Sequence, residues 1–140
     1  MFNKLKKQLK SFSVFFILTL VASNSFIFNN KTFASSLPGL DSFVIHINNT
    51  ASTSTLTNYQ LSFIVDTSDL ISQGLMRSDC GDIRFLDSDN STPINNYWVE
   101  NCNSTATKIW IKIPSIPASS YKNIYMYYNN PNLTSLSSIS

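Results

Sequence analysis

Charged residues are scarce in this sequence, since they make up 13% of its 140 positions. Five of the ten Lys and Arg residues lie within the first 31 positions, whereas all eight acidic residues lie from Asp41 onward. Residues 35–140 therefore hold five bases against eight acids, a formal net charge of −3. Because nucleic-acid binding relies on clustered positive charge, this balance argues against a nucleic-acid partner.

Glycine and histidine are scarce as well, which excludes several kinds of catalytic site. The three glycines, Gly39, Gly74 and Gly81, are too far apart in sequence to form a phosphate-binding loop. His46 is the one histidine, so the sequence offers no His and Cys cluster for zinc. No serine nucleophile elbow and no pair of carboxylates with a catalytic spacing is recognisable. We therefore expect no enzyme and no cofactor, with a glycosidase as a further alternative.

The N-terminal residues have the pattern of a targeting segment. Four lysines between Lys4 and Lys10 precede an apolar run over residues 14–22, and Thr32-Phe33-Ala34 fits a cleavage site. Residues 1–34 are therefore expected to be a signal peptide or, if they are not cleaved, a helical membrane anchor. Either alternative predicts a secreted or extracellular protein that contacts the membrane only through this segment.

The sequence has two cysteines, and both lie in the part expected to be exported. One disulfide between Cys80 and Cys102 is the expectation for such a chain, and a pair of buried thiols is the alternative. A disulfide here closes a loop of 21 intervening residues. On a chain-entropy argument, that closure stabilises the fold by about 3 kcal/mol.

Apolar and polar residues alternate along the rest of the chain, as is typical of β-strands. The alternation predicts a short helix that is capped by Ser68 and ends at Gly74. The turn-rich residues 87–93 predict a hairpin between the third and fourth strands. The strands are expected over residues 43–48, 59–66, 82–87, 96–101, 108–113 and 123–128.

These elements predict an all-β fold, an antiparallel and jelly-roll-like β-sandwich with one short helical turn. The sandwich domain is expected over residues 43–130. A linker over residues 35–42 precedes it, and a loose, Ser-rich tail over residues 131–140 follows it.

Several motifs carry a resemblance to a known family. From Val44 to about Ser138 the chain resembles the domain of unknown function 2341 family, and the Asp-Cys-x-Asp-Ile-Arg-Phe motif that begins at Asp79 is its most specific feature. The resemblance implies an exported β-sandwich module, often found beside lectin-like domains or tethered to membranes, with no known reaction. Asn129 stands where the family usually has Gly. The other matching residues are 45–50, 58–61, 70–71, 74, 77–78, 97–100, 102, 109–114 and 124–130.

Acidic and basic side chains cluster between Arg77 and Asp89. Asp79, Asp82 and Arg84 are expected to form a structural clasp, in which the carboxylates bind loop amides or the two arginines. Calcium binding is the alternative, since Asp87 and Asp89 are spaced like the start of a calcium loop. That pattern fails at Thr92, where such a loop needs glycine.

Four aromatic residues alternate with apolar residues on the expected strands: Trp98, Trp110, Tyr125 and Tyr127. Aromatic rings on a half-solvated sheet can stack on sugar rings, so these are the candidate ligand-binding residues. The alternative is that their face forms part of the core. Lys108 and Lys112 share the face of Trp110 and are hard to bury completely.

Together these features predict a non-catalytic, secreted or cell-surface recognition module. Its expected partner is a carbohydrate or another envelope component, such as an envelope protein. The first alternative is a purely structural spacer or adhesin segment. Further alternatives are a calcium-dependent binding module and a glycosidase.

Overall fold

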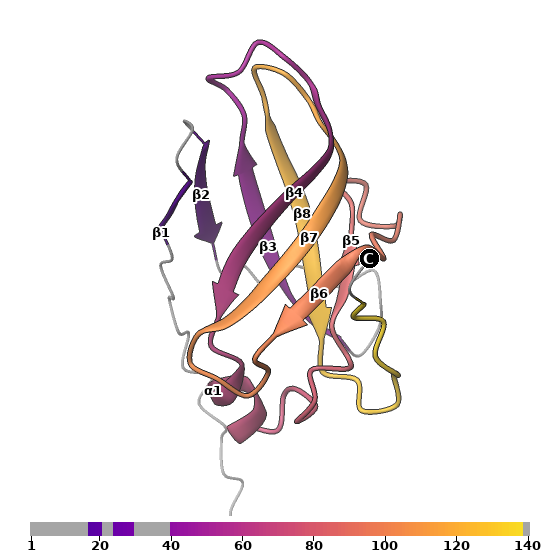
Figure 1. Ribbon diagram of the computed structural model, residues 1–140. Helices are drawn as coiled ribbons and strands as arrows, with labels where there is room; N and C mark the ends of the chain where they lie inside the picture. The colour runs from indigo at the N-terminus through magenta and orange to yellow at the C-terminus, as the bar shows by residue number, and fades with distance from the viewer. Residues whose placement is uncertain (1–16, 21–23, 30–39, 139–140) are drawn as a thin grey trace, which may run out of the picture.

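Two antiparallel sheets make up most of the structure, which is a computed structural model that describes residues 17–20, 24–29 and 40–138 (Figure 1). One sheet has five strands in the order β1-β2-β3-β8-β5, and the other has three in the order β4-β7-β6. The elements are β1 Ile17–Leu20, β2 Asn24–Asn29, β3 Asp41–Asn48, β4 Leu56–Val65, α1 Thr67–Ser72, β5 Arg84–Leu86, β6 Tyr97–Glu100, β7 Thr107–Ile116 and β8 Tyr121–Tyr128.

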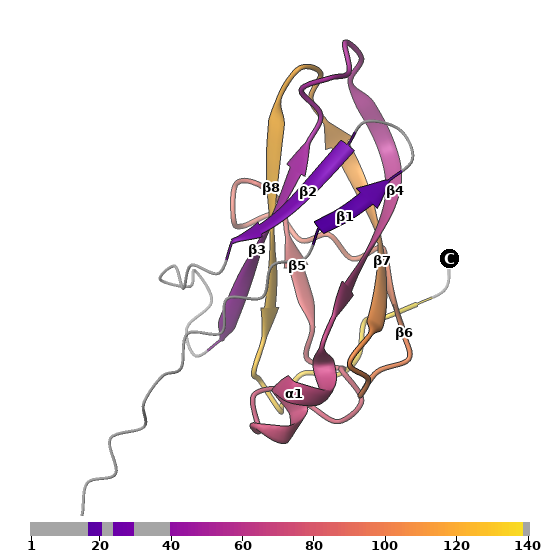
Figure 2. The same cartoon turned by 90° about the vertical axis from the view of Figure 1, so that its left-hand side faces the viewer.

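The core lies between the two sheets, which Figure 2 shows from the side. On β7, Ile109, Ile111 and Ile113 are at most 1% exposed, because alternate residues of a strand point to the same face. The same period places Ile124 and Met126 of β8 in the core, opposite them. The predicted all-β fold is confirmed at this level: the two sheets and the small helical content are compatible with a β-sandwich.

The predicted hairpin between the third and fourth strands forms only next to its turn, where Leu86 and Pro93 make an isolated antiparallel bridge, and the two strands themselves do not pair with each other. β5 pairs with β8, whereas β6 pairs with β7 in the other sheet. Residues 87–93 do form a tight turn, in which the Asp87 amide donates to the Thr92 carbonyl at 2.8 Å. After that turn the chain crosses between the sheets, and Ile94 and Tyr97 become buried in the core.

The short helix forms where it is predicted, but its N-cap differs. Asp66, and not Ser68, is the capping residue, because its carboxylate accepts the Asp69 amide at 2.9 Å. The Ser68 hydroxyl donates to the same carboxylate at 2.7 Å. Gly74 follows the helix with a φ of +70°, a conformation that favours glycine.

The predicted targeting segment, residues 1–34, lies largely outside the described residues. Within it the structure describes only β1 and β2, which pair with each other, and β2 also pairs with β3. The cleavage site and most of the predicted N-terminal helix lie outside the described residues. Over the described ranges, no helix has the length and apolar character needed to span a membrane.

Candidate functional site

Asp79 forms the exposed part of the predicted clasp. Arg77 donates to its two carboxylate oxygens from Nε at 2.8 Å and from Nη2 at 2.7 Å. The Gly81 amide donates to Asp79 Oδ1 at 2.9 Å. The hydrogen bond from Arg77, followed by the one from the Gly81 amide, holds the pKa of Asp79 well below its usual range.

Asp82 forms the buried part of the clasp and is 1% exposed. Its Oδ1 accepts the Arg77 amide at 3.2 Å. Its Oδ2 accepts the amides of Asn129 at 3.0 Å and of Asn130 at 3.3 Å. Asn129 has a φ of +74°, which asparagine tolerates, so the turn survives without the glycine usual in the resembling family. One carboxylate thus joins the start of the Arg77–Asp89 segment to the end of β8.

Among the residues that the structure describes, Arg84 has no acidic partner, contrary to the sequence-based expectation. Its guanidinium donates to three main-chain carbonyls: Gly81 at 3.0 Å, Ile83 at 2.6 Å and Thr134 at 2.6 Å. Because a guanidinium carries five N–H donors, carbonyl oxygens can satisfy it without a carboxylate. Arg84 therefore belongs to the clasp through the backbone.

The C-terminal residues 131–138 are held against the domain and do not form a loose tail. Arg77 Nη1 donates to the carbonyls of Pro131 at 3.1 Å and Leu133 at 2.8 Å. Further along, the Ser138 amide donates to the Tyr97 carbonyl at 3.0 Å, and the Val99 amide donates to Ser137 Oγ at 2.9 Å. No local pattern in residues 131–138 indicates this docking, because it depends on arginines 50 or more residues away.

The depressed pKa of Asp79 predicts a pH-dependent contribution to stability. A carboxylate whose folded pKa is lowered stabilises the fold above its unfolded pKa, which is 3.8, and loses that effect as the pH falls. The free energy of unfolding should therefore be higher for the wild type than for Asp79→Asn at pH 7, with the difference shrinking below about pH 4. Chemical denaturation of both proteins across this range measures it. A difference that grows on acidification would contradict the pairing with Arg77.

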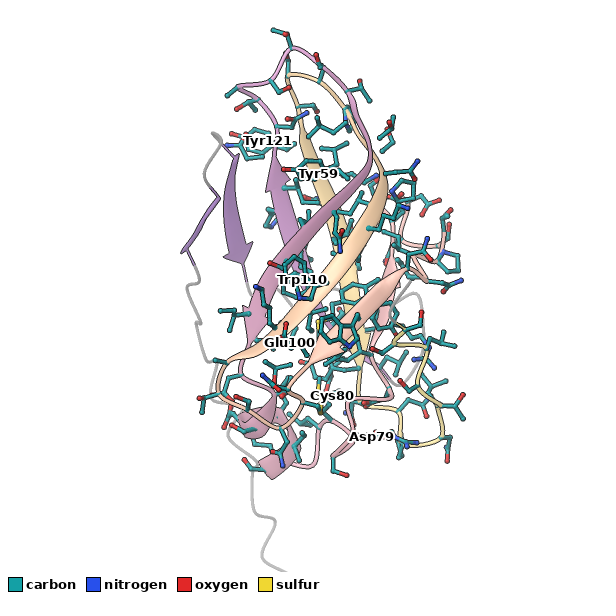
Figure 3. All side chains as sticks on the ribbon, in the orientation of Figure 1. Tyr59, Asp79, Cys80, Glu100, Trp110 and Tyr121 are labelled. Carbon is teal, nitrogen blue, oxygen red and sulfur yellow. A yellow bond between two sulfur atoms is a disulfide. The ribbon has the colours of Figure 1, made fainter. Side chains whose placement is uncertain are left out.

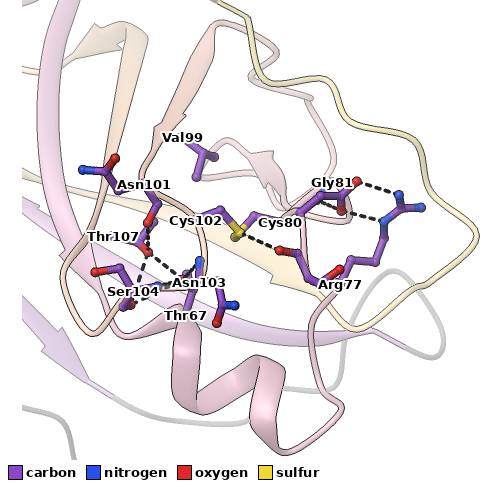
Figure 4. The surroundings of a disulfide bond; sticks show 12 residues. Thr67, Arg77, Cys80, Gly81, Val99, Asn101, Cys102, Asn103, Ser104 and Thr107 are labelled. Carbon is purple, nitrogen blue, oxygen red and sulfur yellow. Dashed lines mark hydrogen bonds and ion pairs between the residues drawn. A yellow bond between two sulfur atoms is a disulfide. The ribbon is translucent and has the colours of Figure 1, made fainter.

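The predicted disulfide is confirmed: Cys80 and Cys102 are joined at an S–S distance of 2.05 Å (Figure 4). It ties the segment after α1 to the turn between β6 and β7. Beside it, Figure 4 shows a cluster of hydroxyl groups, in which Thr67 Oγ1 and Thr107 Oγ1 lie 2.6 Å apart. Both threonines are fully buried. Neither threonine stands out in the sequence, because each is an ordinary polar residue next to an expected strand.

The two aspartates considered for calcium have other partners. Asp87 forms an ion pair with Lys122, whose side chain is 8% exposed. Asp89 accepts the amides of Ser91 at 3.0 Å and Thr92 at 2.8 Å, which makes it a turn-stabilising residue. Among the described residues, no group of three or more His, Cys, Asp or Glu side chains could hold a metal ion. Lys122 lies two residues before Ile124 on β8, so both side chains point to the same, inward face. This spacing in the sequence could have indicated that Lys122 is buried.

Trp98 and Trp110 lie directly opposite each other on β6 and β7. Both are half-buried on the outer face of the three-stranded sheet, opposite in direction to the isoleucine row of β7. They border a groove of about 290 Å³. The other residues of the lining are Asn58, Gln60, Asn96, Tyr97, Ile111, Lys112 and Ser138. We call this the indole groove.

The orientation of Trp110 is fixed by two charged neighbours (Figure 3). Its Nε1 donates to Glu100 Oε2 at 3.1 Å. The Lys108 ammonium lies over the indole, 4.2 Å from the ring centre, in a cation–π contact. Because Lys108 covers one face of the ring, a ligand in the indole groove would meet the opposite face.

The two tyrosine candidates lie on the other sheet, so the structure does not bring them together with the tryptophans. Tyr125 and Tyr127 belong to β8, where they pair with residues of β3 and β5. Tyr127 is 1% exposed, and its hydroxyl donates to Asn90 Oδ1 at 2.7 Å. Tyr125 is half-buried beside Val44 and Leu86. Neither tyrosine borders the indole groove.

The comparisons with known proteins identify one family. Residues 79–140 match the family described as "Domain of unknown function (DUF2341)". No curated protein and no solved structure matches the chain. The matched residues include the clasp, both cysteines and both tryptophans of the indole groove. From Asp79 onward, the chain is therefore similar to the DUF2341 family.

Proposed function

We propose that this protein is a non-catalytic recognition module that works outside the cytosol and binds carbohydrate in the indole groove. The observation that carries the proposal is the pair of neighbouring indoles, Trp98 and Trp110, on the outer face of a sheet. Flat aromatic rings stack on the apolar faces of sugar rings, while nearby amides bind hydroxyl groups. Asn58, Gln60 and Asn96 supply such amides at the groove.

The composition of the indole groove favours binding over cleavage. Glycoside hydrolysis generally uses two carboxylates on either side of the scissile bond. None of the described residues that line the groove is an Asp or Glu. The nearest acid on this face of β6 is Glu100, and it accepts the indole N–H of Trp110. This arrangement supports a site that holds a sugar without reacting with it.

The order of the strands supports a jelly-roll arrangement, the finer form of the predicted sandwich. Outside β1 and β2, the first strand β3 pairs with the last strand β8, and the second strand β4 pairs with β7, the last but one. The third and fourth strands then add to β8 and β7 respectively. Lectin domains are among the proteins that use jelly rolls, although a fold alone does not specify a ligand.

The disulfide supports the extracellular part of the proposal. Cys80 and Cys102 are bonded to each other, and disulfides persist mainly outside the cytosol. The N-terminal lysines and the apolar run that follows them have the pattern of an export signal. Whether the module is released or stays anchored is decided by cleavage after Ala34, which N-terminal sequencing of the exported protein would detect.

Truncating either indole should abolish most of the carbohydrate binding. We expect Trp98→Ala and Trp110→Ala to weaken binding at least about tenfold, because each removes a stacking surface. The domain of residues 35–140 is produced with its natural N-terminal segment where export requires it. A glycan array then identifies its ligands. Titration calorimetry then measures each variant.

Tyr121→Ala provides the matched control, because Tyr121 is an aromatic residue that is 64% exposed and does not line the groove. Its affinity should equal that of the wild type. If no glycan binds, or if both tryptophan variants bind as tightly as the control, the carbohydrate proposal is wrong. The protein would then be better explained as a structural spacer or adhesin segment whose partner is an envelope protein.

A further inference from the structure

The indole groove presents one positive charge to a ligand. Lys112 lies on β7, two residues beyond Trp110, and its side chain is exposed and lines the groove. Across the strand pair it faces Gln60, a neutral side chain. The ion pairs of the described residues join Arg77 to Asp79 and Lys122 to Asp87, so neither involves Lys112. Its ammonium is therefore available for a ligand.

The other charges on this face are directed at Trp110 and not at the groove. Lys108 lies over the indole ring, and Glu100 accepts the indole N–H. Neither residue lines the groove. The remaining polar side chains of the lining residues are amides and the hydroxyl groups of Ser138 and Tyr97, which are neutral. The charge complementarity of the groove is thus determined by Lys112.

This local positive charge stands out against the rest of the protein. Residues 35–140 carry a net charge of −3, so this part of the chain, taken as a whole, repels polyanions. A polyanion would therefore bind here only through a site that places its negative group next to a cation. An ammonium beside a stacking surface recognises an acidic group attached to a ring that stacks on the indole.

We infer that the indole groove selects polysaccharides that carry an anionic group, and that Lys112 is the specificity-determining residue. This inference rests on the proposed carbohydrate function. The sugar ring stacks on Trp98 and Trp110, and Lys112 binds a carboxylate or sulfate on that ring or on its neighbour. The amides of Asn58, Gln60 and Asn96 bind the remaining hydroxyl groups.

The test compares polysaccharides that differ in charge. Polygalacturonate carries carboxylates, dextran sulfate carries sulfates, and unmodified dextran is the neutral counterpart of the latter. Binding of the wild type, Lys112→Gln and Lys108→Gln is measured by titration calorimetry near 0.15 M salt, where long-range attraction is screened. Lys108→Gln is the charge-matched comparison, because it removes the same charge from the same face of the same strand. Since Lys108 also packs on Trp110, the readout is the ratio of the affinities for anionic and neutral polysaccharide, and not either affinity alone.

We expect the wild type to bind at least one anionic polysaccharide about tenfold more tightly than dextran, as one charge-assisted hydrogen bond would allow. Lys112→Gln should remove this preference and leave the affinity for dextran unchanged. Lys108→Gln, which loses its contact with Trp110, should lower both affinities by the same factor and so keep the preference. The anion that shows it distinguishes carboxylate from sulfate recognition.

Two results would overturn the inference and leave the proposed function standing. One is equal binding of neutral and anionic polysaccharides that Lys112→Gln does not change. The other is that both lysine variants lose the preference for the anionic polysaccharide to the same degree, which would indicate general electrostatic attraction and not a site. If no polysaccharide of either kind binds, and none binds on the glycan array, the proposed function fails together with the inference.

Discussion

Replacing Asp82 with alanine is expected to lower the free energy of unfolding by about 3–5 kcal/mol. The carboxylate is 1% exposed and accepts the amides of Arg77, Asn129 and Asn130. Alanine leaves these three donors without their acceptor, and each buried N–H that loses its partner costs about 1–3 kcal/mol. The expected total is below the sum of three such costs, because water can enter the space left by the carboxylate.

Urea denaturation measures this effect, with Asp89→Ala as the matched control. Asp89 also accepts two main-chain amides, from Ser91 and Thr92, but it lies in an exposed turn. Water can replace it there, so its loss should cost much less. Asp82→Asn retains the size of the side chain but replaces one acceptor with a donor that faces a main-chain N–H, so it should also destabilise the protein. Equal midpoints for Asp82→Ala and Asp89→Ala would contradict the clasp.

Removing the disulfide is expected to cost about 3 kcal/mol. The bond between Cys80 and Cys102 spans 22 positions in sequence, and without it the unfolded chain gains the entropy of an open loop. Alanine suits both positions for this test. Cys80 has a φ of +54°, and alanine bears about the same backbone strain there as cysteine does.

Chemical denaturation of Cys80→Ala/Cys102→Ala, compared with the wild type under non-reducing conditions, measures the loss. The wild type in the presence of a reductant provides the control, because its stability should approach that of the double variant. If the oxidised wild type and the double variant unfold at the same denaturant concentration, the disulfide does not stabilise the fold as expected.

The strands could be predicted from the sequence, whereas their partners could not. Alternating burial is a local property, so the Ile109, Ile111 and Ile113 row was visible as a strand with Trp110 on its other face. Pairing depends on where the chain travels after each turn. The turn at residues 87–93 looked like a hairpin, yet it leads to the opposite sheet because Ile94 and Tyr97 are buried in the core.

The candidate site shows the same division between local and long-range information. Each tryptophan could be assigned to the outer face of its own strand, but only the register of β6 and β7 places Trp98 opposite Trp110. Tyr127 has the same alternation, but it is 1% exposed, and its hydroxyl donates to Asn90, 37 residues away. An acidic partner was expected for Arg84. The carbonyl of Thr134, which accepts from its guanidinium instead, comes from a segment with no recognisable sequence pattern.

The docking of residues 131–138 also bears on how copies of the protein behave in solution. β6 is an edge strand, and the outward main-chain groups of Tyr97 and Val99 would otherwise be free to pair with a strand of another molecule. Ser137 and Ser138 occupy these groups. Arg77 and Arg84 hold the same segment by its carbonyls. The two arginines therefore help to protect this edge from intermolecular β-pairing and aggregation.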